Sequence, residues 1–272
     1  MGKIIRNGIE YPTGGGGGGG SSWIESVPEM HRNIFRGQSL GSSVTAAQLS
    51  AIQNGTFSDL YVGDYWTIPT TVDGTTKDVK YRIIDVDYFL NRGSGTTKVT
   101  AHHLVIMPDD SLATAPYNTT ATQAFFKTSS LYTTTLPAID TTLTGIFGDN
   151  LLEHTIPVEA SGSLFGRQWA TLKSDIPSMS QVIGSTIYVP SIAKDTGNTQ
   201  PLFALFALCP RFLTNESASI WWLRDLYAAE SSSTQAQVMG VGGMLAYMNF
   251  TTPEGVRPYF LIGVEAEEET EE

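Results

Sequence analysis

Cysteine is almost missing from this chain of 272 residues. The single Cys209 excludes a disulfide within the chain and a metal site built from several thiolates, and its apolar surroundings predict a small core residue. Histidine is scarce too, with four residues and no H-E-x-x-H spacing. The adjacent His102 and His103 would point to opposite faces of a strand, so we expect one in the core and the other at the surface. No metal and no cofactor are expected.

Positive charge is sparse as well. The 16 lysines and arginines face 27 aspartates and glutamates, which gives a net charge of −11. Six of the glutamates lie in residues 265–272, and −11 without those six charges is −5. Nucleic-acid binding requires clustered cations for counterion release, so we do not expect it.

Long apolar runs are also absent. No stretch of eighteen consecutive apolar residues occurs, and the start at Met1–Arg6 lacks the apolar segment of a secretory signal. We therefore expect synthesis in a bacterial cytoplasm and no membrane insertion.

The first 22 residues differ from the rest in composition. Two β-prone runs flank Asn7-Gly8, a dipeptide that favours a tight hairpin. Gly14–Gly20, Ser21 and Ser22 follow, and nine such residues span about 15–18 Å as a flexible coil. A peptide, a tether and a globular body together indicate an anchor. The alternative is a disordered leader without a role.

These features divide the chain into four parts. In the expected anchor, Ile4, Ile5, Ile9 and Tyr11 are the partner-docking residues. The expected divisions are a docking peptide at 1–12, a glycine-rich tether at 13–22, a single globular domain at 23–264 and an acidic disordered tail at 265–272.

The body begins with a predicted helix and continues mainly as strands. Thr45 and Gln48 have capping-box spacing and Gly55 supplies a stop, which predicts a helix over 45–54. Runs rich in Val, Ile, Tyr and Thr then predict an antiparallel meander. Its strands are expected at 64–69, 79–90 and 98–107.

The second half is less regular. Helical spacing of apolar residues over 129–147 predicts a helix that Pro137 kinks or breaks. We expect long connections over 157–213, with a helix near 179–184. Strands return at 220–225, 238–241, 244–250 and 256–264, separated at 231–233 and 252–255. The fold class is therefore α+β, with mostly antiparallel sheets and a few helices.

Candidate catalytic patterns are few. Gly37–Gly41 matches the G-x-S-x-G nucleophile turn, but no parallel sheet precedes it, so turn glycines are the better interpretation. Asp85 and Asp87 share one face of their strand and Asp109-Asp110 follows the next, which could supply paired carboxylates or calcium ligands. Aspartates at strand ends usually serve turns, and we assign no catalytic residue.

The strand at 221–225 admits two interpretations. Alternation separates Trp221 from Trp222, so we expect one tryptophan in the core and its neighbour packed elsewhere. In the first interpretation, aromatic and arginine side chains recognise a ligand or partner surface, and the candidates are Trp222, Arg224, Tyr227 and Arg257. In the second, the tryptophans and arginines are core residues, and the arginines bond loop carbonyls.

A family resemblance rests on the order of several short motifs. They are Ile34–Gly37, Ala51–Phe57, Leu60–Asp64, Tyr81–Ile83, Trp221–Asp225 and Gly255–Phe260. Their order resembles uncharacterised domains, abundant in phages and prophages of gut Firmicutes, that end in a WWLR-like strand and a GVRP-plus-aromatic strand. The resemblance covers most of residues 30–263. The glycine run after a short peptide is also similar to the start of phage head-fibre proteins, which fasten to the capsid by that end.

The resemblance implies a virion structural protein: a head fibre, a capsid decoration or a minor tail protein. It brings no catalytic residues, and we expect no enzyme activity. The closing strands resemble the C-type-lectin-like fold, although the EPN and WND calcium motifs are absent and Cys209 lacks a partner thiol. The expected partner of residues 1–12 is a capsid or tail protein. By analogy with virion fibres, which are frequently trimeric, we expect a homo-oligomer.

Two other functions stay open. The outer domain could be an adhesin that recognises a host-surface glycan or protein through the loops at 226–236 and 251–255. A polysaccharide-degrading enzyme would rest on the aspartates alone and is the weaker alternative.

Overall fold

The structure is a computed structural model that describes residues 3–6, 9–12, 27–72, 74–93, 98–122, 125–160, 163–184, 200–227 and 234–265. Its strands are mostly antiparallel and its helices few, which confirms the α+β class. The expected tether at 13–22 and residues 266–272 of the expected tail lie outside the described residues.

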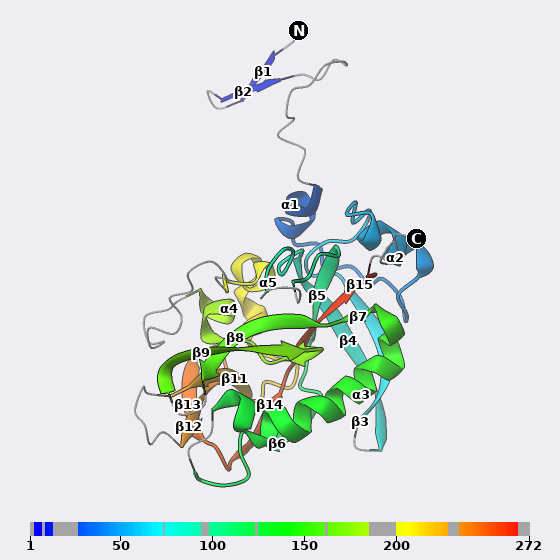
Figure 1. Ribbon diagram of the computed structural model, residues 1–272. Coiled ribbons are helices and arrows are strands. Elements are labelled where there is room, and N and C mark those ends of the chain that lie inside the picture. Colours follow the sequence, from blue (N-terminus) through cyan, green and yellow to red (C-terminus); the bar gives the residue numbers. More distant parts are fainter. Residues whose placement is uncertain are drawn as a thin grey trace, which may run out of the picture.

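A six-stranded sheet forms the centre of the body (Figure 1). The predicted meander is confirmed, since three consecutive strands pair antiparallel. The last strand of the chain completes the sheet between its earlier neighbours. The order is β10 (Ser174–Asp175), β15 (Tyr259–Gly263), β5 (His103–Pro108), β4 (Thr75–Val86) and β3 (Tyr65–Val72), with β7 (Leu151–Leu152) also paired to β15.

A five-stranded sheet holds most of the C-terminal strands. Residues 252–255 were predicted to separate two strands, and this is wrong, because they contribute to a strand that pairs in parallel with the tryptophan strand. Pro253 is compatible with a strand here because it stands at its first residue. The order is β13 (Leu245–Asn249), β12 (Gln235–Met239), β11 (Trp221–Leu226), β14 (Pro253–Val256) and β6 (Ala113–Pro116).

The helices predicted over 45–54 and 129–147 both form. Helix α2 (Ala46–Gln53) carries the capping box: the Gln48 backbone N–H donates to Thr45 Oγ1 at 3.2 Å, and the Thr45 N–H donates to Gln48 Oε1 at 2.9 Å. Pro137 lies in the first turn of α3 (Leu136–Phe147), where a preceding π-helical segment, η3 (Leu131–Thr135), changes to α. The proline marks that change, because it has no N–H to continue the π-helical bonds, such as the one from the Leu136 N–H to the Leu131 carbonyl.

The region 157–213 departs from its prediction. Instead of long connections, its first part pairs as a hairpin, β8 (His154–Ala160) with β9 (Ser163–Leu172). The predicted helix near 179–184 is confirmed as α4 (Met179–Ile183). The remaining elements are β1 (Lys3–Arg6), β2 (Ile9–Pro12), α1 (Val27–Arg32), the 3₁₀ turns η2 (Phe126–Thr128), η4 (Gly148–Asn150) and η6 (Pro210–Leu213), and α5 (Ala204–Leu208).

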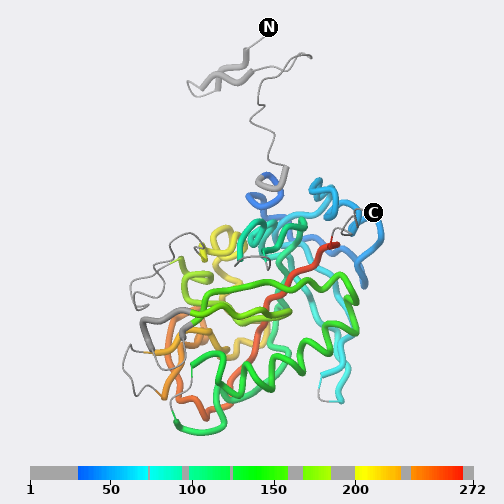
Figure 2. Tube along the Cα trace, viewed as in Figure 1, coloured from blue at the N-terminus to red at the C-terminus, as the bar shows by residue number. Residues whose placement is uncertain are grey.

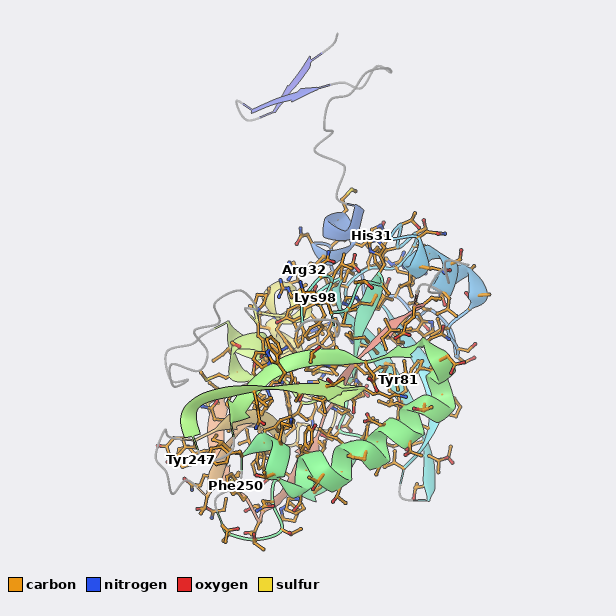
Figure 3. All side chains as sticks on the ribbon, in the orientation of Figure 1. His31, Arg32, Tyr81, Lys98, Tyr247 and Phe250 are labelled. Atoms are coloured by element: carbon orange, nitrogen blue, oxygen red, sulfur yellow. The ribbon has the colours of Figure 1, made fainter. Side chains whose placement is uncertain are left out.

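Helix α3 and the central sheet share an aromatic core. The Tyr81 ring, which Figure 3 shows in the middle of the body, packs edge to face on Phe147 and Phe260, with ring centroids 5.5 Å and 5.9 Å away. Strand β15, which supplies Phe260, runs through the body toward the end where α1 and α2 lie (Figure 2). No helix in the described part of the chain combines the length and apolar character that crossing a membrane requires.

Two glycines provide a matched test of this packing. A Cβ on Gly263 would lie 2.6 Å from the His102 carbonyl oxygen and 2.7 Å from Leu152 Cδ1, whereas a Cβ on Gly145, in α3, meets nothing within 4 Å. We predict that Gly263→Ala lowers the free energy of unfolding by about 1–3 kcal/mol through overpacking. Gly145→Ala should raise it by roughly 0.5–1 kcal/mol, because alanine favours a helix interior. Urea unfolding measures both, and a similar shift in both variants would contradict the packing of β15.

Candidate functional site

The N-terminal hairpin is a sheet of its own. Strand β1 pairs antiparallel with β2, placing Ile4 opposite Tyr11, Ile5 opposite Glu10 and Arg6 opposite Ile9. The predicted hairpin therefore forms, and its expected turn at Asn7-Gly8 lies outside the described residues. The strands of the body belong to other sheets.

Three of the four predicted recognition residues lie inside the domain. Trp222 is fully buried and donates from Nε1 to the Ala115 carbonyl at 2.8 Å. Arg257 is buried and donates from Nε to the Pro108 carbonyl at 2.8 Å and from Nη1 to the Phe212 carbonyl at 2.7 Å. Both side chains donate hydrogen bonds to backbone carbonyls inside the domain, which agrees with their interpretation as core residues. The expectation that only one tryptophan is in the core is wrong, because Trp221 is fully buried too.

Arg224 belongs to a buried polar cluster. Its guanidinium forms an ion pair with Asp175 and donates to the Ile176 carbonyl at 3.3 Å. The Tyr259 hydroxyl donates to the same Asp175 carboxylate at 2.7 Å. Burial raises the pKa of Tyr259. The cluster joins β10, β11 and β15 and leaves Arg224 buried.

Tyr227 is the exposed member of the predicted set. Its ring is stacked on Tyr247 of β13, with centroids 3.9 Å apart and planes 20° apart. Val241 and Met244, in the turn between β12 and β13, are also exposed. These four residues, which we name the hairpin patch, are exposed on or beside the β12–β13 hairpin.

The candidate carboxylates are occupied by structural contacts. Asp85 and Asp87 were expected on one face of their strand, but the strand is irregular there. The register of β4 shifts next to Asp85, and Asp87 has a positive φ of 52°. Asp85 is fully buried and accepts bonds from Arg32 Nε at 2.5 Å and the Ala204 N–H at 2.9 Å. Asp87 instead accepts from His102 Nδ1 at 2.7 Å and from the backbone N–H of His103. The two carboxylates thus hold separate segments.

The histidine pair divides as predicted: His103 is fully buried, while the His102 side chain is about one-third exposed. Cys209, expected in the core, is only half-buried. Within the described ranges, no three His, Cys, Asp or Glu side chains gather where they could hold a metal ion.

A pocket of about 560 Å³ opens beside β3, β4 and η6. It combines cations, carboxylates and aromatic rings. Its lining residues are Phe35, Arg36, Gly37, Tyr65, Lys80, Arg82, Asp109, Arg211, Phe212, Thr214, Asn215 and Glu216.

Arg82 is the most constrained cation of the pocket. Its Nε donates to Asp109 Oδ1 at 2.6 Å, its Nη2 bonds the other carboxylate oxygen, and its Nη1 bonds the Gly63 carbonyl. Its guanidinium lies 4.8 Å from the Tyr65 ring centroid and 4.4 Å from that of Phe212. A buried ion pair with both aromatic and backbone partners gives the pocket a rigid base.

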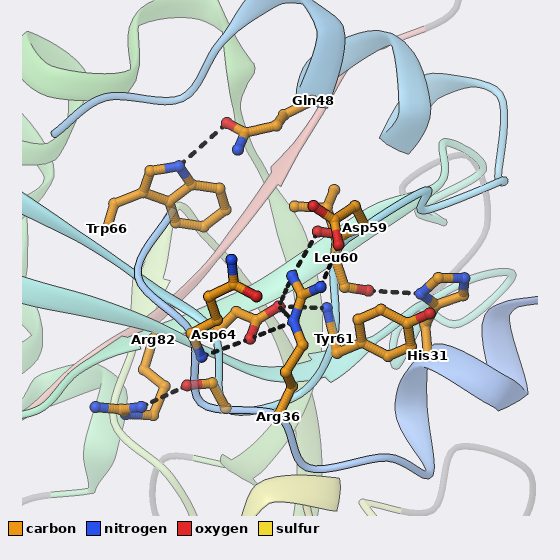
Figure 4. Close-up of polar contacts among 11 residues, drawn as sticks. His31, Arg36, Gln48, Asp59, Leu60, Tyr61, Asp64, Trp66 and Arg82 are labelled. Atoms are coloured by element: carbon orange, nitrogen blue, oxygen red, sulfur yellow. Dashed lines mark hydrogen bonds and ion pairs between the residues drawn. The ribbon is translucent and has the colours of Figure 1, made fainter. Parts of the chain in front are cut away.

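Arg36 adjoins this base and is also fixed (Figure 4). It donates to the buried Asp64 carboxylate, with Nη2 at 2.6 Å from Oδ2, and to the Asp59 carbonyl at 2.8 Å. Asp64 also accepts the backbone N–H groups of Gln38 at 2.8 Å and Tyr61 at 2.9 Å. One carboxylate therefore ties the loop around residue 36 to the start of β3.

The remaining two cations stand at the rim. Lys80 forms an ion pair with Glu216, and both side chains are at least one-third exposed. Arg211 is exposed, with its guanidinium 5.0 Å from the Phe212 ring centroid and 5.9 Å from that of Phe35. Within the described residues, Arg211 forms no ion pair or side-chain hydrogen bond. The arrangement suits binding of a polar ligand.

Sequence reasoning did not find this pocket. Its residues come from five separate stretches of the chain, and no spacing rule joins Arg36, Arg82 and Arg211. The local signals were Phe35-Arg36 and Arg211-Phe212, in each of which an arginine stands beside an aromatic residue.

Comparison of the chain with protein-family models, with curated proteins and with solved structures gave no match. Function must therefore be argued from the geometry of this chain.

His154 provides a pH-dependent test of the core. It is buried against Phe89 and Tyr259, and neither ring nitrogen has a hydrogen-bond partner among the residues that the structure describes. Burial lowers the pKa of His154 to about 3. Between that value and the ordinary histidine pKa of about 6.5, only the unfolded chain binds the proton, so stability falls as the pH falls below about 6.5.

Between pH 6.5 and pH 5, we predict that the free energy of unfolding falls by about 2 kcal/mol more in the wild type than in His154→Leu. Urea unfolding at several pH values measures the slope for wild type and variant. His103, whose pKa burial also lowers, is present in both proteins. Parallel curves would contradict the buried neutral state of His154.

Proposed function

We propose that this protein is a virion structural component, a head fibre, capsid decoration or minor tail protein, without enzyme activity. In this proposal, residues 1–12 fasten it to a capsid or tail subunit and the body is displayed outward. The observation that carries the proposal is the separate β1–β2 hairpin, followed in the sequence by seven glycines.

A two-stranded hairpin suits docking by strand addition. Each of its strands pairs on one side with the other, and the outer edges keep unpaired backbone N–H and C=O groups. A partner strand can add to such an edge, which gives affinity through main-chain hydrogen bonds. An isolated hairpin is at best marginally stable in water, so a partner sheet would also stabilise it.

The body has two distinct ends. Helix α1, where the described body begins, lies at one end, and the β12–β13 hairpin lies at the other (Figure 1). Figure 3 likewise places His31 and Arg32 far from Tyr247. An anchor that leads into α1 would therefore hold the hairpin patch away from the attachment point.

Deletion of residues 1–22 tests the anchor. We predict a protein with an unchanged midpoint of thermal unfolding that is missing from purified particles, because the body keeps its sheets and loses its attachment. Quantitative mass spectrometry of particles measures incorporation. The matched control is deletion of residues 267–272, which should leave incorporation unchanged. Full incorporation of the 1–22 deletion would refute the docking proposal.

A second function, adhesion to the host surface, is favoured by the hairpin patch. Exposed aromatic and methionine side chains are typical of contact surfaces, and Tyr227, Met244 and Tyr247 lie on or beside the β12–β13 hairpin. In this candidate function, the displayed end binds a glycan or protein of the host.

The Tyr227–Tyr247 stack tests adhesion. We predict that Tyr247→Ala weakens binding of the purified protein to host cells by about tenfold, as expected for loss of an aromatic hot-spot residue. Met30, exposed near α1, provides the control substitution Met30→Ala. Flow cytometry with labelled protein measures both. Equal binding by the two variants would exclude the hairpin patch as the adhesive surface.

A further inference from the structure

We propose that the pocket beside β3, β4 and η6 binds a carboxylated sugar residue, and that Arg211 recognises its carboxylate. This site is distinct from the β1–β2 hairpin and from the hairpin patch. It does not depend on where the protein is attached, so its test is independent of the virion proposal.

The cations of the pocket differ in whether a carboxylate of the protein already pairs with them. Arg36 is held by Asp64 and Asp59, Arg82 by Asp109, and Lys80 by Glu216. Among the lining residues, Arg211 is the cation that meets no carboxylate in the described part of the chain. An arriving anion would gain most from this guanidinium.

The stacking of Arg211 favours a planar anion. The Arg211 guanidinium carbon lies 5.0 Å from the Phe212 ring centroid and 5.9 Å from that of Phe35. A guanidinium is planar, and its N–H donors form a fork along an edge of that plane. Such an edge matches a carboxylate through two parallel hydrogen bonds. The aromatic contacts also limit the rotamers of Arg211, which reduces the entropy lost on binding.

The other groups of the pocket fit a sugar. Lys80 and Glu216 place a donor and an acceptor side by side at the rim, and the Thr214 hydroxyl can act as either, which suits sugar hydroxyls that both donate and accept. The carboxylates of Asp109 and Glu216 can accept hydrogen bonds from hydroxyl groups, which favours a hydroxyl-rich sugar over a phosphate dianion. A volume of about 560 Å³ is ample for one or two sugar rings.

The pocket is also held in shape before any ligand arrives. The Glu216 N–H donates to the Asp109 carbonyl at 3.1 Å, and Asn215 Oδ1 accepts the Ser219 N–H at 2.7 Å. The segment that supplies Thr214 and Glu216 is thereby fixed to the base that Arg82 and Asp109 form. A preformed site needs little reorganisation to bind.

Two sugars that differ only in the carboxylate test the proposal. Methyl β-glucuronide and methyl β-glucoside are titrated into the full-length protein by isothermal calorimetry, with inorganic phosphate as a third probe. We expect the glucuronide to bind at least about tenfold more tightly than the glucoside, as for a charge-assisted bidentate bond. Phosphate should not compete.

Variants separate recognition from folding. Arg211→Ala should weaken glucuronide binding by at least about tenfold and leave thermal unfolding unchanged, because Arg211 is exposed. Arg211→Lys, which keeps the charge and loses the fork, should bind with intermediate affinity. Arg92→Ala is the control, since Arg92 also lies over a ring, that of Tyr88, and does not line the pocket.

Four results would overturn the proposal. Equal affinity for the two glycosides would show that the carboxylate is not recognised. An unchanged affinity of Arg211→Ala for the glucuronide would show that Arg211 is not the residue that binds it. Binding of phosphate in place of the glucuronide, or no binding of either sugar at millimolar concentration, would reject the ligand class.

Discussion

Buried carboxylates, each joined to an arginine, hold the irregular parts of this fold in place. Removing one member of such a pair leaves an uncompensated charge in the interior, so each pair fixes the segments that supply it. The loop around residue 36, helix α1, the end of β5 and strand β10 are all held in this way. The pairs are Arg36–Asp64, Arg32–Asp85, Arg82–Asp109 and Arg224–Asp175.

The same pairs decide which arginines can act outside the domain. The chain has few cations, and most of those described bind its own carboxylates and carbonyls. Arg257 is the clearest case, because it is buried and has two carbonyl partners. The side chains that could bind a ligand or partner are exposed: Arg211 beside its aromatic neighbours, and the stacked tyrosines of the hairpin patch. Structure and binding thus use separate sets of side chains.

The elements that the sequence predicted well are those with local signals. The Thr45–Gln48 capping box, the β-rich runs of the meander and the spacing of α3 each act within a few residues. The β8–β9 hairpin was missed because Pro157 and Gly166 interrupt its runs, and proline usually argues against a strand interior. The pocket and the arginine–aspartate pairs could not be predicted from local sequence patterns, because the partners are far apart in the chain. Arg36 and Asp64 are 28 residues apart, and Arg82 and Asp109 are 27 residues apart. Only the folded sheet brings them together.

The position of β15 has a consequence for biosynthesis. Its two edges pair with β5 on one side and with β7 and β10 on the other, so segments near residues 105, 151 and 174 all depend on residues 259–263. Until this strand has left the ribosome, β7 and β10 lack their partner in the sheet and one edge of β5 is unpaired, so these edges are open to association with other chains. The body therefore folds late, after nearly the whole described chain has left the ribosome, and protection of these edges by chaperones matters most in that interval.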